Sequence, residues 1–172
     1  MNSTIKKIIL VLLRWVSRAI LWRHKPIVIA ITGSVGKTST KDAIFIVLSK
    51  FKKVRKSEKS FNGEIGVPLT ILGLENAWRS PLGWLNNLWL GFGVLKTKDY
   101  PELLILEVGS DHPGDITRLT SWITPEISVV TRLPDVPVHV EYFESPAALR
   151  EEDAMVAAAL PEGGVYIANA DD

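Results

Sequence analysis

The chain has 172 residues, enough for one well-packed core or for one domain with an appendage. Its hydrophobic content of 47% with 23% charged residues is typical of a globular protein and excludes a disordered one. The absence of cysteine excludes disulfides and thiolate metal sites and is compatible with a reducing compartment.

The net charge of +1 conceals two differently charged parts of the chain. Residues 1–25 contain six Lys or Arg side chains and no acid, so residues 26–172 carry 14 basic and 19 acidic side chains, a net of −5. This distribution argues against nucleic-acid binding by the acidic part. It favours an anionic partner for the basic part.

Residues 5–22 predict an amphipathic helix. Their unbroken apolar run, residues 8–13, is too short to span a bilayer, and Lys7, Arg14 and Arg18 fall on one helical face. Three interpretations stay open: a helix lying on an anionic membrane surface, a helix packed on protein, and a signal peptide, although no small-residue cleavage site follows.

Residues 27–40, I-V-I-A-I-T-G-S-V-G-K-T-S-T, join an apolar strand to a glycine turn and the start of a helix. Such a junction binds anions, because backbone N–H groups at the helix start point at the ligand. Lys37 supplies a charge for the phosphates of a nucleotide, and the Thr38 hydroxyl can ligate Mg²⁺. The loop is a short G-x-x-G-K-T variant, and its predicted nucleotide-binding residues are Gly33, Ser34, Gly36, Lys37, Thr38 and Ser39.

Beyond the loop, strand and helix patterns alternate, which predicts a doubly wound α/β fold. The predicted strands are residues 27–32, 53–55, 103–108, 127–131 and 164–168, and the predicted helices are residues 37–50, 67–74, 115–122 and 146–160. A tryptophan-rich stretch at about 76–100 has the look of an insertion. Its aromatic residues suit either a membrane-facing side or ordinary packing on the body.

Glu107 directly follows the apolar residues 103–106 of the strand predicted at 103–108. The carboxyl ends of strands are where α/β sheets place ligand chemistry, and a carboxylate there is well placed to bind Mg²⁺.

Four stretches in order resemble the Mur ligases, the ATP-dependent amide ligases of peptidoglycan synthesis. They are T-G-S-V-G-K-T-S-T-K-D at 32–42, F-N-G-E-I-G-V-P-L-T-I-L at 61–72, L-E-V-G-S-D-H-P-G-D-I at 106–116, and H-V-E at 139–141 with N-A-D-D at 169–172. They are most similar to the members that add D-alanyl-D-alanine to the UDP-muramoyl tripeptide. The resemblance covers about residues 26–172. It implies the family's central ATP-binding domain: a phosphate loop and a mostly parallel sheet with helices on both faces. The amphipathic helix of residues 1–25, predicted from its own sequence pattern, precedes this domain.

The resemblance also implies roles for single residues. Lys37, Glu107 and His139 match catalytic positions; Thr38, Glu107 and His139 would hold the metal; Asn62 and Asn169 would contact the nucleotide. Asp153 stands where many Mur ligases carry a lysine that CO₂ converts to a metal-binding carbamate. A one-residue shift of the alignment would bring in Glu151 or Glu152 instead.

The activity implied is an ATP- and Mg²⁺-dependent carboxylate–amine ligase of peptidoglycan precursor synthesis that works through an acyl phosphate. Its substrates would be a UDP-muramoyl peptide or related carboxylate and an amino acid or dipeptide amine. The location would be cytoplasmic, including the inner face of the membrane. The family's UDP-binding and C-terminal domains have no counterpart in the sequence, so we expect a fragment that is inactive alone.

Two alternatives stay open. One is a membrane-associated Mur-type ligase of another polymer, similar to poly-γ-glutamate synthases or to the ligases that amidate lipid II. The other is a nucleotide-binding protein without catalysis, which the carboxylate at Asp153 and the missing domains favour.

Overall fold

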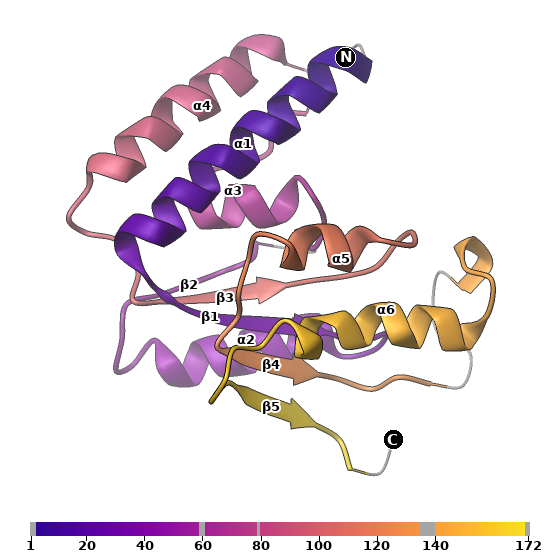
Figure 1. The fold of residues 1–172 in the computed structure, drawn as a ribbon. Helices are drawn as coiled ribbons and strands as arrows, with labels where there is room; N and C mark the ends of the chain where they lie inside the picture. Colours follow the sequence, from indigo (N-terminus) through magenta and orange to yellow (C-terminus); the bar gives the residue numbers. More distant parts are fainter. Residues whose placement is uncertain (1–2, 59–60, 79, 135–139, 171–172) are drawn as a thin grey trace.

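The computed structural model describes residues 3–58, 61–78, 80–134 and 140–170 (Figure 1). Within these residues, five parallel strands form one sheet in the order β2-β3-β1-β4-β5. The strands are β1 (Ile27–Thr32), β2 (Val54–Lys56), β3 (Leu103–Glu107), β4 (Ile127–Val130) and β5 (Val165–Ala168). The helices are α1 (Ser3–His24), α2 (Lys37–Leu48), α3 (Gly66–Leu72), α4 (Pro81–Lys96), α5 (Asp115–Thr120) and α6 (Pro146–Ala158), with a 3₁₀ turn, η1 (Val140–Tyr142).

Helices cover both faces of the sheet, because the central strands are apolar on both sides. Ile29 and Ile31 of β1 belong to a cluster with the inner side chains of α2. Val28 and Ala30 face the opposite way, into the larger cluster that α1, α3, α5 and α6 complete. Side chains alternate across a strand, so a strand buried on both faces reads as a continuous apolar run. The predicted α/β class is confirmed.

The predicted elements agree with the structure to within a few residues. The helix predicted at 37–50 ends at Leu48, and the strand predicted at 53–55 is β2, one residue later. The prediction left the tryptophan-rich stretch without a secondary structure, and it forms α4.

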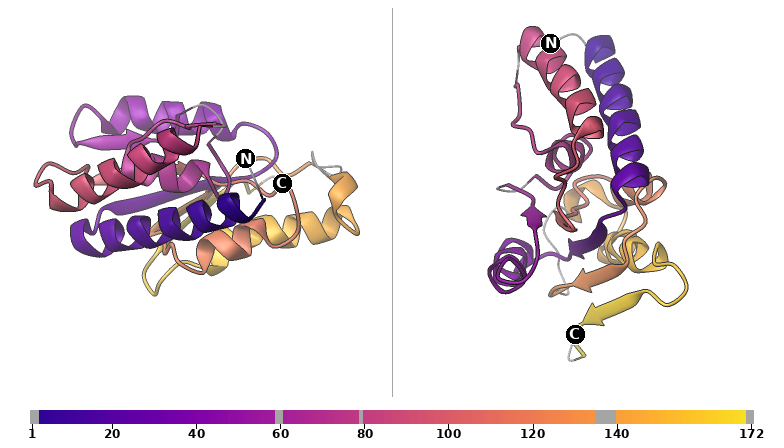
Figure 2. Two further views of the ribbon diagram at one scale, coloured as in Figure 1. Left: turned by 90° about the horizontal axis from the view of Figure 1, so that it is seen from above. Right: turned by 90° about the vertical axis from the view of Figure 1, so that its left-hand side faces the viewer.

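Helices α1 and α4 lie side by side and form a layer outside α3, on the side remote from β4 and β5 (Figures 1 and 2). The inner side of α1 is part of the main core through Ile9, Leu13, Val16 and Ile20. Gly91 allows α4 to approach closely, since a Cβ there would lie 2.7 Å from Leu72 Cδ2 and 3.2 Å from Val16 Cγ1. The amphipathic helix predicted for residues 5–22 is therefore packed on protein along its inner side.

Tyr100 ties this outer layer to the sheet. Its hydroxyl donates to the Ile71 carbonyl of α3 at 2.6 Å, and the His24 ring stacks on it with 4.5 Å between ring centres. On the same tyrosine, the Arg55 guanidinium carbon of β2 lies 5.1 Å from the ring centre. Burial raises the pKa of the Tyr100 hydroxyl. In the described part of the chain, no helix is both long enough and apolar enough to cross a membrane.

Candidate nucleotide-binding site

The glycine loop joins β1 to α2 at the centre of the sheet. β1 lies between β3 and β4, so the loop stands at the point where the strand order reverses, where α/β sheets bind ligands. Gly33 has φ +119°, and a Cβ there would lie 2.3 Å from Thr131 Oγ1. Gly36 precedes α2 with φ +93°, and no side chain caps the helix. The first N–H groups of α2 therefore point out of the loop with no capping side chain in front of them.

Two polar groups of the loop are poised for a ligand. The Lys37 ammonium donates to the carbonyl of Gly33, so it folds back over its own loop. The Ser34 hydroxyl oxygen is buried and has no hydrogen-bond partner among the described residues. A buried polar atom without a partner is costly, and a phosphate oxygen would satisfy it.

Glu107 ends β3 beside the loop because β3 pairs with β1, with Glu107 opposite Ile31. The Thr38 hydroxyl donates to Glu107 Oε2 at 3.1 Å. Lys41 lies on the same side of α2, and its ammonium is 3.6 Å from the same carboxylate oxygen. The side chains of Lys41 and Glu107 are each only 2% exposed, so this is a buried ion pair.

The sequence reading did not single out Lys41. The sequence did indicate its position, because Lys41 follows Thr38 by three residues and Lys37 by four. This spacing places all three residues on one side of a helix.

The carboxylate of Asp153, which belongs to α6, lies in the same region. Its Oδ1 accepts from the Thr32 hydroxyl at 3.1 Å and from the Ser110 hydroxyl at 3.0 Å. Burial raises the pKa of the Asp153 carboxyl, and the two hydroxyls and the Lys37 charge partly offset that effect. Gly33, Ser34, Lys37, Asn62 and Asp153 line a cavity of about 30 Å³, so the structure brings these five predicted residues together.

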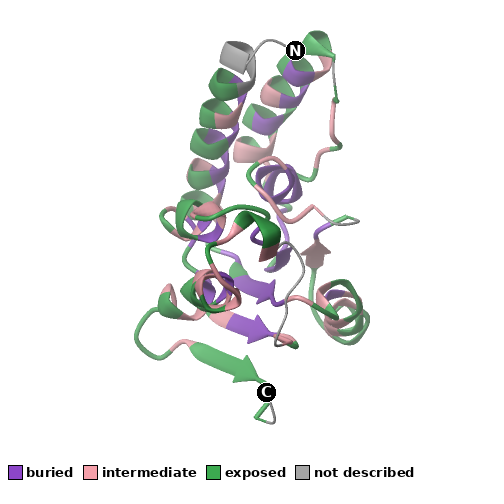
Figure 3. Ribbon diagram, turned by 90° about the vertical axis from the view of Figure 1, so that its right-hand side faces the viewer, coloured by how far each residue is buried: buried purple, intermediate pink, exposed green. Residues whose placement is uncertain are grey.

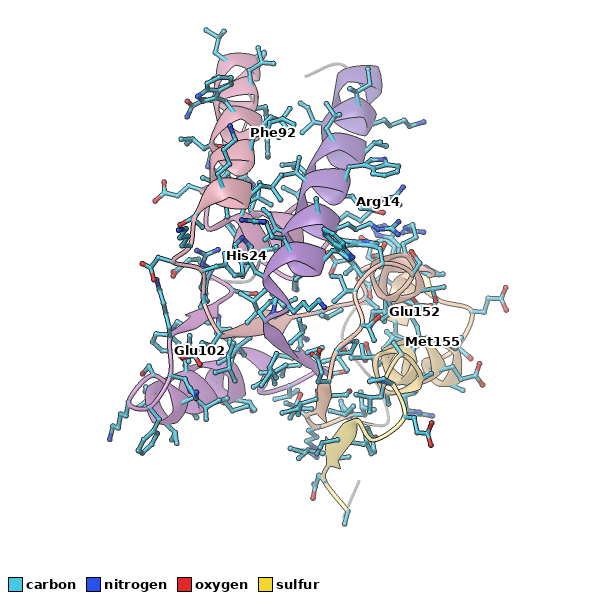
Figure 4. The ribbon with its side chains drawn as sticks, turned by 60° about the vertical axis from the view of Figure 1, so that its left-hand side comes forward. Arg14, His24, Phe92, Glu102, Glu152 and Met155 are labelled. Carbon is cyan, nitrogen blue, oxygen red and sulfur yellow. The ribbon has the colours of Figure 1, made fainter. Side chains whose placement is uncertain are left out.

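The neighbouring carboxylates of α6, Glu151 and Glu152, do not line this cavity. Glu152 Oε1 accepts from the backbone N–H groups of Ile116 and Thr117 at 2.8 and 3.1 Å, which caps the start of α5 (Figure 4). Glu151 is exposed. Of the three candidates that the alignment left open, Asp153 is the one that lines the cavity beside Lys37.

The remaining predicted residues have different positions. Asn62 approaches Gly109, where an added Cβ would lie 2.9 Å from Asn62 Nδ2, and Asn62 O accepts from the Gly109 N–H at 3.1 Å. Ser39 is exposed in the first turn of α2. Asn169 follows β5, is exposed, and does not line the cavity at Lys37. His139 lies outside the described residues.

The oxygens at this site fit Mg²⁺ bound together with a nucleotide. No group of three or more His, Asp or Glu side chains in the described ranges could hold a metal by itself. Mg²⁺ does not need one, because it is usually held by one or two carboxylates together with phosphate oxygens and water. The Thr38 hydroxyl and the Glu107 carboxylate, 3.1 Å apart, are such a partial set of oxygen ligands.

The protein-family model for the Mur ligase middle domain matches residues 84–172 of this sequence, slightly more than half of the chain. The chain belongs to the Mur ligase family. Similar relatives include UDP-N-acetylmuramoyl-tripeptide–D-alanyl-D-alanine ligases. The one from Escherichia coli (strain K12) is 31% identical over 145 residues, covering 84% of this chain and 26% of the relative. That of Mycobacterium leprae is 35% identical over the same length, covering 84% and 23%. This Mur ligase chain spans about a quarter of the length of these relatives.

Solved structures agree on the fold. A MurF ligase from Thermotoga maritima in complex with ADP has a TM-score of 0.72 at 24% identity, covering 100% of this chain and 33% of its own. MurF from Acinetobacter baumannii has a TM-score of 0.68 at 20% identity, covering 91% and 29%. The Mur ligase middle domain predicted from four sequence stretches is confirmed.

Proposed function

We propose that this Mur ligase chain binds Mg-ATP at the loop Gly33–Thr38 and serves an ATP-dependent carboxylate–amine ligase of peptidoglycan precursor synthesis. The observation that carries the proposal is the pairing of Thr38 with Glu107 at the end of β3, directly beside Lys37. This pairing sets a metal-ligating hydroxyl and a carboxylate against a phosphate-binding loop.

The reaction has two steps. A carboxylate oxygen of the acceptor attacks the γ-phosphorus of ATP, the bond to the bridging oxygen breaks, and ADP leaves. The amine nitrogen then attacks the acyl carbon of the resulting acyl phosphate, loses a proton, and expels inorganic phosphate. Because the protein does little covalent chemistry in such transfers, positioning and charge stabilisation supply most of the catalysis.

The residues of the loop have distinct parts in this proposal. Lys37 exchanges the Gly33 carbonyl for a phosphate oxygen, and Ser34 gains the partner that its hydroxyl lacks among the described residues. Mg²⁺, held by Thr38 and Glu107, would neutralise charge on the phosphates. His139 belongs to the proposal as a further metal ligand, and Asn62, Ser39 and Asn169 as nucleotide contacts, by resemblance.

Asp153 is proposed to replace the modified lysine of other Mur ligases. It is a carboxylate without any reaction with CO₂, and two hydroxyls fix one of its oxygens. Ligase activity that depends on Asp153 should therefore not respond to added bicarbonate.

The proposed acceptor is a UDP-muramoyl peptide and the proposed amine is D-alanyl-D-alanine, which the names of the relatives support. A second candidate is a Mur-type ligase of a polymer made at the membrane. The exposed apolar and cationic surface of α1 and α4 favours it. Both candidates share a cytoplasmic location, where ATP is supplied.

The metal role is tested by the Mg²⁺ dependence of ATP binding. Thr38→Val removes the hydroxyl and keeps the shape of the side chain, and Thr38 is exposed, so the fold should persist. Calorimetry should show that Mg²⁺ strengthens ATP binding to the wild type and to Thr40→Val, a control in the same helix, but much less to Thr38→Val. Equal Mg²⁺ dependence in all three proteins would reject the assignment.

The amide-forming step is tested separately. We propose that the 172 residues alone bind nucleotide without forming the amide bond, since they span about a quarter of the relatives. Phosphate release from this chain that requires both a UDP-muramoyl peptide and D-alanyl-D-alanine would contradict that proposal.

A further inference from the structure

The outward-facing sides of α1 and α4 carry large apolar side chains in the solvent. Seven of them are between 53% and 80% exposed. We call these seven residues the α1/α4 outer face: Ile8, Trp15 and Trp22 of α1, and Leu82, Leu85, Trp89 and Phe92 of α4. Exposed sides of both helices are visible in Figure 3, where they contrast with the buried sides turned toward α3.

Packing of the chain on itself does not account for this face. α4 already uses its opposite side, with Trp84, Asn87 and Gly91, to pack against the rest of the molecule. α1 likewise buries Leu13, Val16 and Ile20. Single exposed apolar residues are ordinary, whereas large apolar side chains exposed repeatedly along two neighbouring helices indicate an interaction surface.

The charge of the two helices indicates what this surface meets. Their sequences contain six Lys or Arg residues and no Asp or Glu. Lys7, Arg14 and Arg18 follow one another along one side of α1, and none of them makes an ion pair with another described residue. Arg14 projects from α1 on the side away from α4 (Figure 4). The rest of the chain carries a net negative charge, so the two helices hold the net positive charge of the molecule.

We propose that the α1/α4 outer face binds the surface of an anionic lipid membrane. Tryptophan and leucine side chains would enter the headgroup region, and the cationic side of α1 would meet lipid phosphates. Neither helix qualifies as a membrane span, so the contact is interfacial. The proposal does not depend on nucleotide binding, and it extends the surface predicted for residues 1–25 to α4.

Co-sedimentation of the 172-residue chain with vesicles tests the proposal. The vesicles are phosphatidylcholine alone, or phosphatidylcholine with an equal amount of phosphatidylglycerol. We expect pelleting with the anionic vesicles at low salt. Pelleting should weaken on neutral vesicles and at 1 M salt, where the Debye length falls to about 3 Å.

The apolar part is tested by Leu85→Gln/Trp89→Gln. Both side chains are exposed, so the substitution should leave the thermal midpoint nearly unchanged while the partition coefficient falls at least about tenfold. The matched control is Ile46→Gln/Val47→Gln, which changes two apolar residues on α2 that are also more than half exposed. The control should pellet like the wild type.

The cationic part is tested by Arg14→Gln/Arg18→Gln. Each cation near an anionic surface is worth about a fivefold change in partition, so the pair should lower it roughly 25-fold. Lys50→Gln/Lys52→Gln, on the exposed segment after α2, is the control and should have little effect.

Three outcomes would overturn the proposal. The first is a wild-type chain that stays in the supernatant with anionic vesicles at low salt. The second is pelleting that Leu85→Gln/Trp89→Gln does not reduce, because α4 would then take no part. The third is a dimer in sedimentation velocity that this variant dissociates while the wild type does not pellet, which would assign the face to a second copy of the chain.

Discussion

The buried ion pair of Lys41 and Glu107 is the feature of the site whose energetics can be predicted most sharply. Lys41→Met removes the ammonium and leaves the carboxylate of Glu107 with the Thr38 hydroxyl. Glu107→Gln removes the negative charge and leaves Lys41 with Asp42, whose carboxylate lies 3.9 Å from the ammonium. A double-mutant cycle separates the energy of the pair from these other contacts.

The size of the effect follows from the distance and the burial. At 3.6 Å and an effective dielectric constant of about 20, the attraction between the two charges is about 4–5 kcal/mol. Removing one partner of a buried pair usually lowers the free energy of unfolding by about 3–5 kcal/mol, because the other charge stays buried. Glu107→Gln should fall at the lower end, since Asp42 compensates part of the charge on Lys41. We expect a coupling energy of at least about 2 kcal/mol.

Urea unfolding followed by far-UV circular dichroism measures all four proteins of the cycle. The control is the same cycle at Lys52 and Glu102, a pair that is closer, at 2.8 Å, but whose side chains are each about half exposed. Solvent screens such a pair, so its coupling should be close to experimental error. A coupling below about 0.5 kcal/mol at Lys41 and Glu107 would refute the reasoning, because burial would then not strengthen the pair.

Two further variants probe the loop and Asp153. Gly33→Ala should lower the free energy of unfolding by about 1–3 kcal/mol, because Gly33 has φ +119° and the added Cβ would meet Thr131. Gly93→Ala, at an open position in a helix, should raise the free energy of unfolding by about 0.5–1 kcal/mol. Urea unfolding that changes in the same direction for both variants would contradict this reasoning. The raised pKa of Asp153 means that the folded chain holds a proton over a pH interval where the unfolded chain has lost it, so this group's contribution to stability falls as pH rises through that interval. In thermal unfolding, the stability of Asp153→Asn relative to the wild type should therefore increase as the pH rises above the ordinary pKa of an Asp carboxyl. A relative stability that decreases with pH would show that the pKa of Asp153 is not raised.

The parts of the fold that sequence could predict are those with a strong local signal. β1 and the loop could be predicted directly, because a run of mostly β-branched residues is followed by a turn with two glycines, both of which adopt positive φ. α4 was missed as a helix, since its apolar residues surround it and give no clear stripe. Its start did have a signal: Pro81 opens the helix, and the Ser80 hydroxyl accepts from the Gly83 N–H at 3.0 Å.

The sequence could predict the site residues that lie at the ends of strands, but not which of the site residues contact one another. Glu107 at the end of an apolar strand was an evident candidate, but its contact with Thr38 requires β3 to be the neighbour of β1. Among Glu151, Glu152 and Asp153, consecutive positions on a helix point about 100° apart, so tertiary contacts alone decide which one lines the cavity. The order of the strands and the packing of α6 depend on contacts between residues far apart in the sequence. Local sequence patterns therefore could not predict them.

The central claim is that the loop at Gly33–Thr38 binds Mg-ATP, and calorimetric titration of Mg-ATP into the wild type and Lys37→Ala tests it most directly. Lys37→Ala removes a charge-assisted contact worth about 1.5–3 kcal/mol, which corresponds to a loss of affinity of roughly 10- to 150-fold. Lys50→Gln, with the same charge change outside the loop, should bind like the wild type. Measurable binding by the wild type with equal affinity in Lys37→Ala would contradict the account.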